Sequence, residues 1–191
     1  MRLTAALAVA GVVLTAALAT GCSDDDPPDA DPSNSPSTSS SPTESAEPSV
    51  APADGKVLAT DTFTANAPRG WSTRRGGTSL AVQVFAFSHD ELTFVAISDG
   101  PAVNDDSIDE RAQEVARSDE FDRAPKVMEP VTIDGVGAYR VAGDVGNGSY
   151  IIEVGTITGG QDVNLRLETF NVSPEESQQI LDAVLASWQW S

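Results

Sequence analysis

Cysteine, histidine and basic residues are scarce in this chain. Its 191 residues include one cysteine, one histidine and 11 lysines and arginines, against 29 aspartates and glutamates, for a formal net charge of -18. A single cysteine excludes an intramolecular disulfide and a multi-cysteine metal site. The excess of negative charge disfavours binding to nucleic acid or to an anionic lipid surface, because both repel an acidic protein.

Charged residues are also missing from the segment that follows the first two residues. Met1 and Arg2 precede an uncharged, largely apolar run over residues 3–20. A short positive segment before such a run is typical of a secretion signal. We therefore expect the rest of the chain to be exported. An uncleaved membrane-spanning helix is the alternative, and it would deliver the chain to the same side.

The single cysteine follows this run directly. Leu18-Ala19-Thr20-Gly21-Cys22 resembles the lipobox of bacterial lipoproteins, although Ala19 stands where leucine is usual. The resemblance implies a lipoprotein signal peptide over residues 1–21 and attachment of a diacylglyceryl group to the Cys22 thiolate. Two acyl chains hold a protein stably on a membrane, so we predict a lipid anchor at the extracytoplasmic face of the cell membrane. The alternative is a cysteine buried in a core.

Basic and aromatic residues are absent from residues 23–54. This segment instead contains seven prolines, three consecutive aspartates and a serine- and threonine-rich block over residues 33–43. Such a sequence buries too little apolar surface to offset the entropy of ordering. The sequence therefore predicts a disordered, acidic stalk over residues 22–54, either a glycosylated spacer or a plain soluble linker.

Residues 55–191 carry the patterns of one folded domain. Three dipeptides suit the positive φ angles of tight turns: Asp134-Gly135, Asn147-Gly148 and Gly159-Gly160. Alternating or continuous apolar runs predict strands between and before these turns. The expected strands cover residues 60–65, 79–88, 92–98, 131–133, 136–145, 149–158 and 162–170.

Two helices are expected, and both have start signals. Ser107 with Glu110 and Ser173 with Glu176 match the capping box, and Pro174 stands at a first helical position. The first helix is predicted to reach about residue 121 and the second about residue 188. The predicted order is βββ-α-ββββ-α, which favours an α+β sandwich on a mostly antiparallel sheet with a helix on each face.

Several of these segments resemble a known family. Phe63, the Pro68-Arg69-Gly70-Trp71 turn, residues 131–139 and the Ala186-Ser187-Trp188 end of the last helix are similar to Mog1/PsbP-like proteins, in particular the LpqN-type lipoproteins of actinobacteria. The resemblance implies an α/β/α sandwich that serves as a binding or accessory module at the cell envelope. It carries over no catalytic residue.

Signals for enzymatic chemistry are sparse. His89 is the only histidine and lies in a predicted turn, and no Gly-x-Ser-x-Gly motif presents a nucleophile. The acidic residues near Asn104 and Glu110 lack EF-hand spacing and suit the positive end of a helix dipole. We therefore expect no enzyme, no catalytic residue, no metal and no cofactor. A hydrolase that uses His89 is the least favoured alternative.

Tryptophans are the best candidates for partner or ligand contacts. Trp71, Trp188 and Trp190 combine a large apolar ring with a polar N–H, although such residues also close the rim of a small core. The sequence thus predicts a membrane-anchored, non-catalytic binding module for an envelope protein or a glycan. A carrier of an apolar ligand such as a lipid, held between the last helix at Ile180 and Val184 and the sheet, is the alternative.

Overall fold

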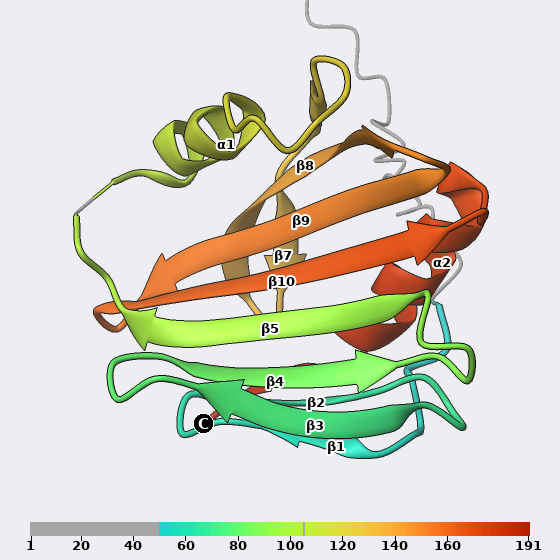
Figure 1. Cartoon of the computed structure of the whole chain (residues 1–191). Helices are drawn as coiled ribbons and strands as arrows, with labels where there is room; N and C mark the ends of the chain where they lie inside the picture. The colour runs from blue at the N-terminus through green and yellow to red at the C-terminus, as the bar shows by residue number, and fades with distance from the viewer. Residues whose placement is uncertain (1–49, 105) are drawn as a thin grey trace, which may run out of the picture. The chain divides into compact units, whose positions relative to one another are not determined.

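The structure is a computed structural model that describes residues 50–104 and 106–191 (Figure 1). The predicted signal peptide, Cys22 and most of the predicted stalk lie outside the described residues. The two helices found in the described part are α1 (Ile108–Ala116) and α2 (Pro174–Leu185). The strands there are β1 (Val57–Ala59), β2 (Phe63–Asn66), β3 (Ser72–Gly77), β4 (Val82–Phe87), β5 (Phe94–Pro101), β6 (Lys126–Val127), β7 (Val131–Ile133), β8 (Val136–Gly146), β9 (Ser149–Thr158), β10 (Gln161–Phe170) and β11 (Gln189–Trp190).

The strands of the described part form two sheets. The main sheet has the order β3-β4-β5-β10-β9-β8-β6, with β7 also paired to β8, and a three-stranded sheet has the order β1-β2-β11. Neighbouring strands in both sheets are antiparallel. The predicted α+β class with a mostly antiparallel sheet is therefore confirmed.

Turn and cap residues act locally as the sequence predicts. Asp134 and Gly135 have φ angles of 44° and 84°, and the other two predicted turns also have positive φ at both central residues. Such turns match the twist of antiparallel strands, so each joins two neighbouring strands. Ser107 and Ser173 each accept a hydrogen bond from the backbone N–H three residues on, which completes both capping boxes.

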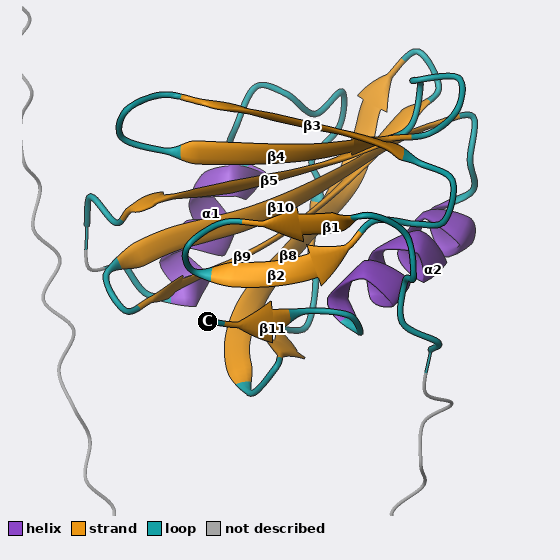
Figure 2. Cartoon of the chain, turned by 90° about the horizontal axis from the view of Figure 1, so that it is seen from below, coloured by secondary structure: helices purple, strands orange, loops and turns teal. Residues whose placement is uncertain are grey.

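The two helices cover opposite faces of the main sheet. Along β8, Tyr139 and Val141 pack against Ala112 of α1, whereas Ala138 and Ala142 belong to the large core that includes Leu181 of α2. Alternate residues of a strand point to opposite faces, so the two helices lie on different sides. Figure 2 shows α2 on the same side as β1, β2 and β11. The predicted α/β/α sandwich had a helix alone on each face. The structure differs on one face, where the outer layer contains both α2 and the small sheet of β1, β2 and β11.

The predicted order βββ-α-ββββ-α is wrong in its strand count. The structure adds β1, β3, β6 and β11 to the expected strands. β3 has the sequence Ser-Thr-Arg-Arg-Gly-Gly and is mostly exposed at the sheet edge, so it has no apolar alternation to detect. β11 is two residues long and forms only because Trp190 pairs with Phe63 of β2. Strands this short depend on a distant partner rather than on local sequence.

Candidate functional site

The predicted tryptophans lie at the core and its rim. Trp188 is only 4% exposed and stacks on Phe63 with ring centroids 4.2 Å apart. Trp190 is half-buried, packs edge-on against Trp188 at 5.3 Å, and donates its indole N–H to the Ile133 carbonyl at 2.8 Å. Trp71 is also half-buried and packs against the same core. The structure thus brings Trp188 and Trp190 together, and both contribute to packing.

A polar pocket lies on the other face of the main sheet, beside α1. We call it the α1 pocket. Its volume is about 400 Å³, which lies within the usual range for small-molecule sites. Its lining comes from β4, β5, β9, β10, α1 and the segment after α1: Gln83, Ala96, Ser98, Arg111, Glu114, Val115, Ser118, Glu120, Glu153, Asn164 and Arg166.

Three neutral polar side chains form the floor of the α1 pocket. Gln83 is paired with Ser98 across β4 and β5, and Ser98 is paired with Asn164 across β5 and β10. The Gln83 amide donates to the Ser98 hydroxyl at 3.1 Å. Directly paired residues on one face of a sheet lie within contact distance, so these amide and hydroxyl groups form one continuous row. All three are partly buried.

Glu153 is a carboxyl group of this pocket that contacts a buried tyrosine. Its Oε1 accepts a hydrogen bond from the Tyr139 hydroxyl at 2.9 Å, and Tyr139 itself is 2% exposed. Burial raises the pKa of Glu153, and the Tyr139 hydrogen bond opposes this by favouring the ionised carboxylate. Burial, together with the charge of Glu153, also raises the pKa of Tyr139, so its hydroxyl stays protonated.

Gly155 makes the contact between Tyr139 and Glu153 possible. A methyl group at this position would lie 2.6 Å from the Tyr139 hydroxyl oxygen and 2.7 Å from two carbons of its ring. Gly155 is paired with Tyr139 across β9 and β8, and the tyrosine ring lies over the glycine. A side chain at position 155 would therefore push the ring away.

The two arginines of the α1 pocket are occupied by carboxylates. Arg111 forms ion pairs with Glu114 and, at 2.8 Å, with Asp162. Arg166 forms ion pairs with Glu120 and, at 3.2 Å, with Glu168. Burial lowers the pKa of each arginine, but the neighbouring carboxylates outweigh burial and raise the pKa overall. The pocket therefore offers no unpaired guanidinium to an anionic ligand.

An aromatic surface adjoins the α1 pocket. Phe85 is paired with Ala96, which lines the pocket, and its ring lies 6.0 Å from that of Phe87. The ring of Phe87 lies 5.8 Å from that of Phe94. These phenylalanines are partly buried, so polar groups and an apolar surface lie next to one another on this face.

Catalytic and metal-binding groupings do not stand out in the described part of the chain. His89 lies exposed in the turn between β4 and β5, away from the lining of the α1 pocket. Among residues 50–104 and 106–191, no cluster of three or more His, Cys, Asp or Glu side chains is arranged to hold a metal ion. Neither of the helices described there is long and apolar enough to cross a membrane. The lining of the α1 pocket can bind by hydrogen bonding, but it lacks a base-activated nucleophile.

Most of the α1 pocket was missed by sequence reasoning. Asn164, Arg166 and Glu168 alternate with the core residues of β10, a pattern that by itself indicates only a solvent-facing side. Glu153 stands in an otherwise apolar run of β9, and this was the one local sign of an unusual carboxyl group. Nothing in the sequence indicated that these residues would meet Gln83 and Arg111.

Comparisons with known proteins give structural similarities only. No family model matches the chain, and no curated protein matches it. The chain is similar to the solution structure of cyanobacterial PsbP (CyanoP) from Synechocystis sp. PCC 6803, with 17% sequence identity and a TM-score of 0.49 over 71% of this chain and 92% of that one. It is also similar to a crystal structure from Bacteroides thetaiotaomicron, with 16% identity and a TM-score of 0.44 over 68% of this chain and 45% of that one. Neither similarity assigns a role to a residue of this chain.

Proposed function

We propose that the protein is a lipid-anchored, extracytoplasmic binding module that holds a neutral glycan in the α1 pocket without chemically changing it. The observation that carries this proposal is the combination of a neutral hydrogen-bonding row with arginines already paired to carboxylates. Hydroxyl groups of a sugar match amide and hydroxyl side chains as both donors and acceptors. The surplus of carboxylates over arginines in the lining would repel an anionic ligand.

The neighbouring phenylalanines support a glycan over other neutral ligands. One face of a sugar ring is lined with C–H groups, and an aromatic ring beside a polar pocket removes that face from water. Phe85 and Ala96 form the cross-strand row beside that of Gln83 and Ser98. A ligand that bonds to Gln83 and Ser98 therefore extends toward the Phe85 ring. A chain of several sugars fits along the row from Asn164 to Gln83 and then reaches Phe85 in the adjacent row.

The anchor belongs to the same proposal and has its support in the sequence. The apolar run, the lipobox-like residues up to Cys22 and the proline- and aspartate-rich stalk form the series of an exported lipoprotein. We further propose that the chain is an LpqN-type lipoprotein with a Mog1/PsbP-like domain. A domain this acidic needs a covalent anchor to remain at a membrane, because anionic lipid repels it.

The carrier alternative gains no support from the packing between α2 and the sheet. Val184 is completely buried, and Ile180 packs against the same core. These two side chains belong to the packed core, so the ligand position predicted at Ile180 and Val184 themselves is filled. We therefore favour the α1 pocket over a lipid cavity as the binding site.

Calorimetric titration of the full chain in detergent with neutral oligosaccharides tests the proposal. The probes are oligomers of glucose, mannose, galactose and N-acetylglucosamine, with sialylated forms as anionic counterparts. At least one neutral oligomer should bind, and the Gln83→Ala/Asn164→Ala double variant should weaken it roughly tenfold, since each lost hydrogen bond costs about 0.5–1.5 kcal/mol.

A matched control separates this site from the general surface. Gln179→Ala removes an exposed amide from α2, on the opposite face, and should leave the affinity unchanged. Equal binding by the double variant and the wild type would contradict the assigned pocket. Cleavage of the bound oligosaccharide would contradict the non-catalytic role.

A further inference from the structure

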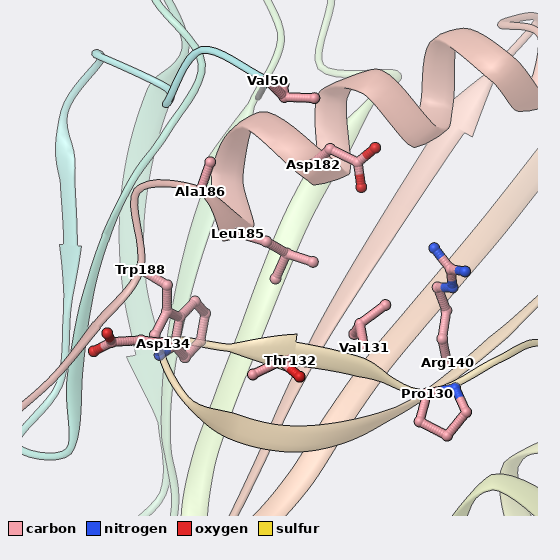
Figure 3. A pocket seen from close by; sticks show the side chains of 10 residues that line it. All are labelled: Val50, Pro130, Val131, Thr132, Asp134, Arg140, Asp182, Leu185, Ala186 and Trp188. Atoms are coloured by element: carbon pink, nitrogen blue, oxygen red, sulfur yellow. The ribbon is translucent and has the colours of Figure 1, made fainter. Parts of the chain in front are cut away.

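A second concave site, the α2 groove, lies on the opposite face of the main sheet. It runs between α2 and β7 and has a volume of about 880 Å³ (Figure 3). Val131 and Leu185 line its middle, and Arg140 and Trp188 lie toward its two ends (Figure 3). Arg140 comes from β8, whose even-numbered residues face α2 here, so this groove shares no wall with the α1 pocket.

Arg140 differs from the arginines of the α1 pocket because no ion pair to it is found within the described residues. Its Nε is buried and has no hydrogen-bond partner. Figure 3 shows its guanidinium group projecting toward the groove, on the side of Asp182. A guanidinium carries five N–H donors, and a buried donor without an acceptor is unfavourable. This side chain is therefore available to an acceptor in the groove.

Trp188 provides a second unsatisfied donor at the same groove. Its side chain is 4% exposed, and its indole Nε1 has no hydrogen-bond partner. Four buried polar side-chain atoms without a partner occur in the described part of the chain; the other two are the donor Nε of Arg111 and the acceptor Oδ1 of Asp162, whose side chains form an ion pair through other atoms. Two of the three unsatisfied donors found there therefore belong to residues that line the α2 groove.

Two carboxylates also line the α2 groove. Asp182 accepts from the Gln178 amide at 2.6 Å, and Asp134 accepts from the Trp190 backbone N–H at 3.1 Å. One cation and two anions therefore face a site with an apolar middle. A polyanion would be repelled by the two aspartates, whereas a ligand with one carboxylate and one ammonium group matches both signs of charge.

We propose that the α2 groove binds a short, extended peptide with free termini. Its carboxylate pairs with Arg140, its apolar side chains pack on Val131 and Leu185, and its ammonium group faces Asp134, at the Trp188 end of the groove. Charged hydrogen bonds between a guanidinium and a carboxylate are short and geometrically specific. An extended peptide advances about 3.3–3.6 Å per residue, so a few residues bring both ends to charged walls of one groove. This is a site for a second ligand and does not depend on the glycan proposal.

The stalk is the competing occupant and must be distinguished. Val50 lines the α2 groove, and the Ala53 N–H donates to the Ala183 carbonyl of α2 at 2.7 Å, so the chain enters the domain at this edge. Glu47 precedes Val50 by three residues. A stalk carboxylate on Arg140 would explain the unpaired guanidinium without any peptide ligand.

Titration of the full chain in detergent with the peptide Ala-Leu-Ala and two blocked forms tests the proposal. Peptide binding should change the fluorescence of the Trp188–Trp190 pair, followed in a Trp71→Phe background. The free peptide should bind about tenfold more tightly than its C-terminal amide, because the amide has lost the charge that pairs with Arg140. N-acetylation should also weaken binding, since it removes the ammonium group.

Arg140→Gln should abolish the preference for the free carboxylate, whereas Arg117→Gln, at an exposed position after α1, should preserve it. Equal affinity of the free and amidated peptides for the wild type, or no binding of either, would overturn the proposal without requiring any variant to fold. Binding that appears only after Glu47→Gln would identify the stalk as the occupant and would equally overturn it.

Discussion

Replacing Tyr139 with phenylalanine isolates the contact that shapes the α1 pocket. The substitution keeps the buried ring and removes only the O–H that donates to Glu153 at 2.9 Å. A hydrogen bond to a charged group contributes about 1.5–3 kcal/mol, and one between neutral groups about 0.5–1.5 kcal/mol. The loss of stability should therefore depend on whether Glu153 is ionised.

The contribution of Glu153 to the free energy of unfolding changes with pH in a definite direction. Burial raises the pKa of Glu153 in the folded state, so the folded chain binds this proton more tightly than the unfolded chain. The stabilisation from that proton is complete below the unfolded pKa and is lost as the pH rises through the folded pKa. Because the Tyr139 hydrogen bond lowers the pKa of Glu153, Tyr139→Phe should raise it further and enlarge the loss at high pH.

Urea unfolding at about pH 5 and about pH 8 measures this difference. Tyr139→Phe should cost more at the higher pH than at the lower one, between limits of roughly 0.5–1.5 kcal/mol for a protonated and roughly 1.5–3 kcal/mol for an ionised Glu153. Glu153→Gln is the matched control, because its amide oxygen accepts the same O–H at every pH. In that background the cost of Tyr139→Phe should be the same at both pH values, and an equal cost at both in the Glu153 protein would refute the reasoning.

Three further predictions concern packing and the anchor. Gly155→Ala should cost about 1–3 kcal/mol by displacing Tyr139, whereas Gly137→Ala, where an added methyl meets its nearest atom only at 4.0 Å, should be far milder in thermal unfolding. Trp188→Ala should cost about 3–5 kcal/mol in urea unfolding because a 4% exposed ring leaves a cavity, and a cost under about 1 kcal/mol would contradict its place in the core. Cys22→Ser should move the protein from the membrane fraction to the soluble fraction and prevent labelling with palmitate, and unchanged fractionation would rule out the lipid anchor.

Local chemistry explains why the helix starts and hairpin turns were predictable. Ser107 and Ser173 satisfy backbone groups three residues away, and Asp134-Gly135 adopts its turn because of its own backbone preferences. These signals lie within a few residues of the structure they determine. The alternation of apolar and polar residues along β10 likewise predicts that Val163, Leu165 and Leu167 face the core, and each is at most 2% exposed.

The candidate site was not predictable in the same way. Gln83, Ser98 and Asn164 come from three strands, and their row exists only because β10 lies beside β5 rather than at the sheet edge. The raised pKa of Glu153 likewise depends on burial produced by packing around β9. The sequence indicated the tryptophans as candidate ligand contacts, yet Trp188 is mostly a core residue.

The amino-acid sequence by itself determined the hairpins, the helix starts, the α+β class and the acidic, cysteine-poor character of this protein, because each depends on near neighbours or on composition. Only the tertiary structure decided which face each helix covers, that β3 and β11 exist, and that Arg140 lacks an ion-pair partner among the described residues while Arg111 and Arg166 have theirs. The pairs Arg111–Asp162 and Arg166–Glu120 join residues far apart in the chain. They are selected by the register of the whole sheet, which no short stretch of sequence encodes.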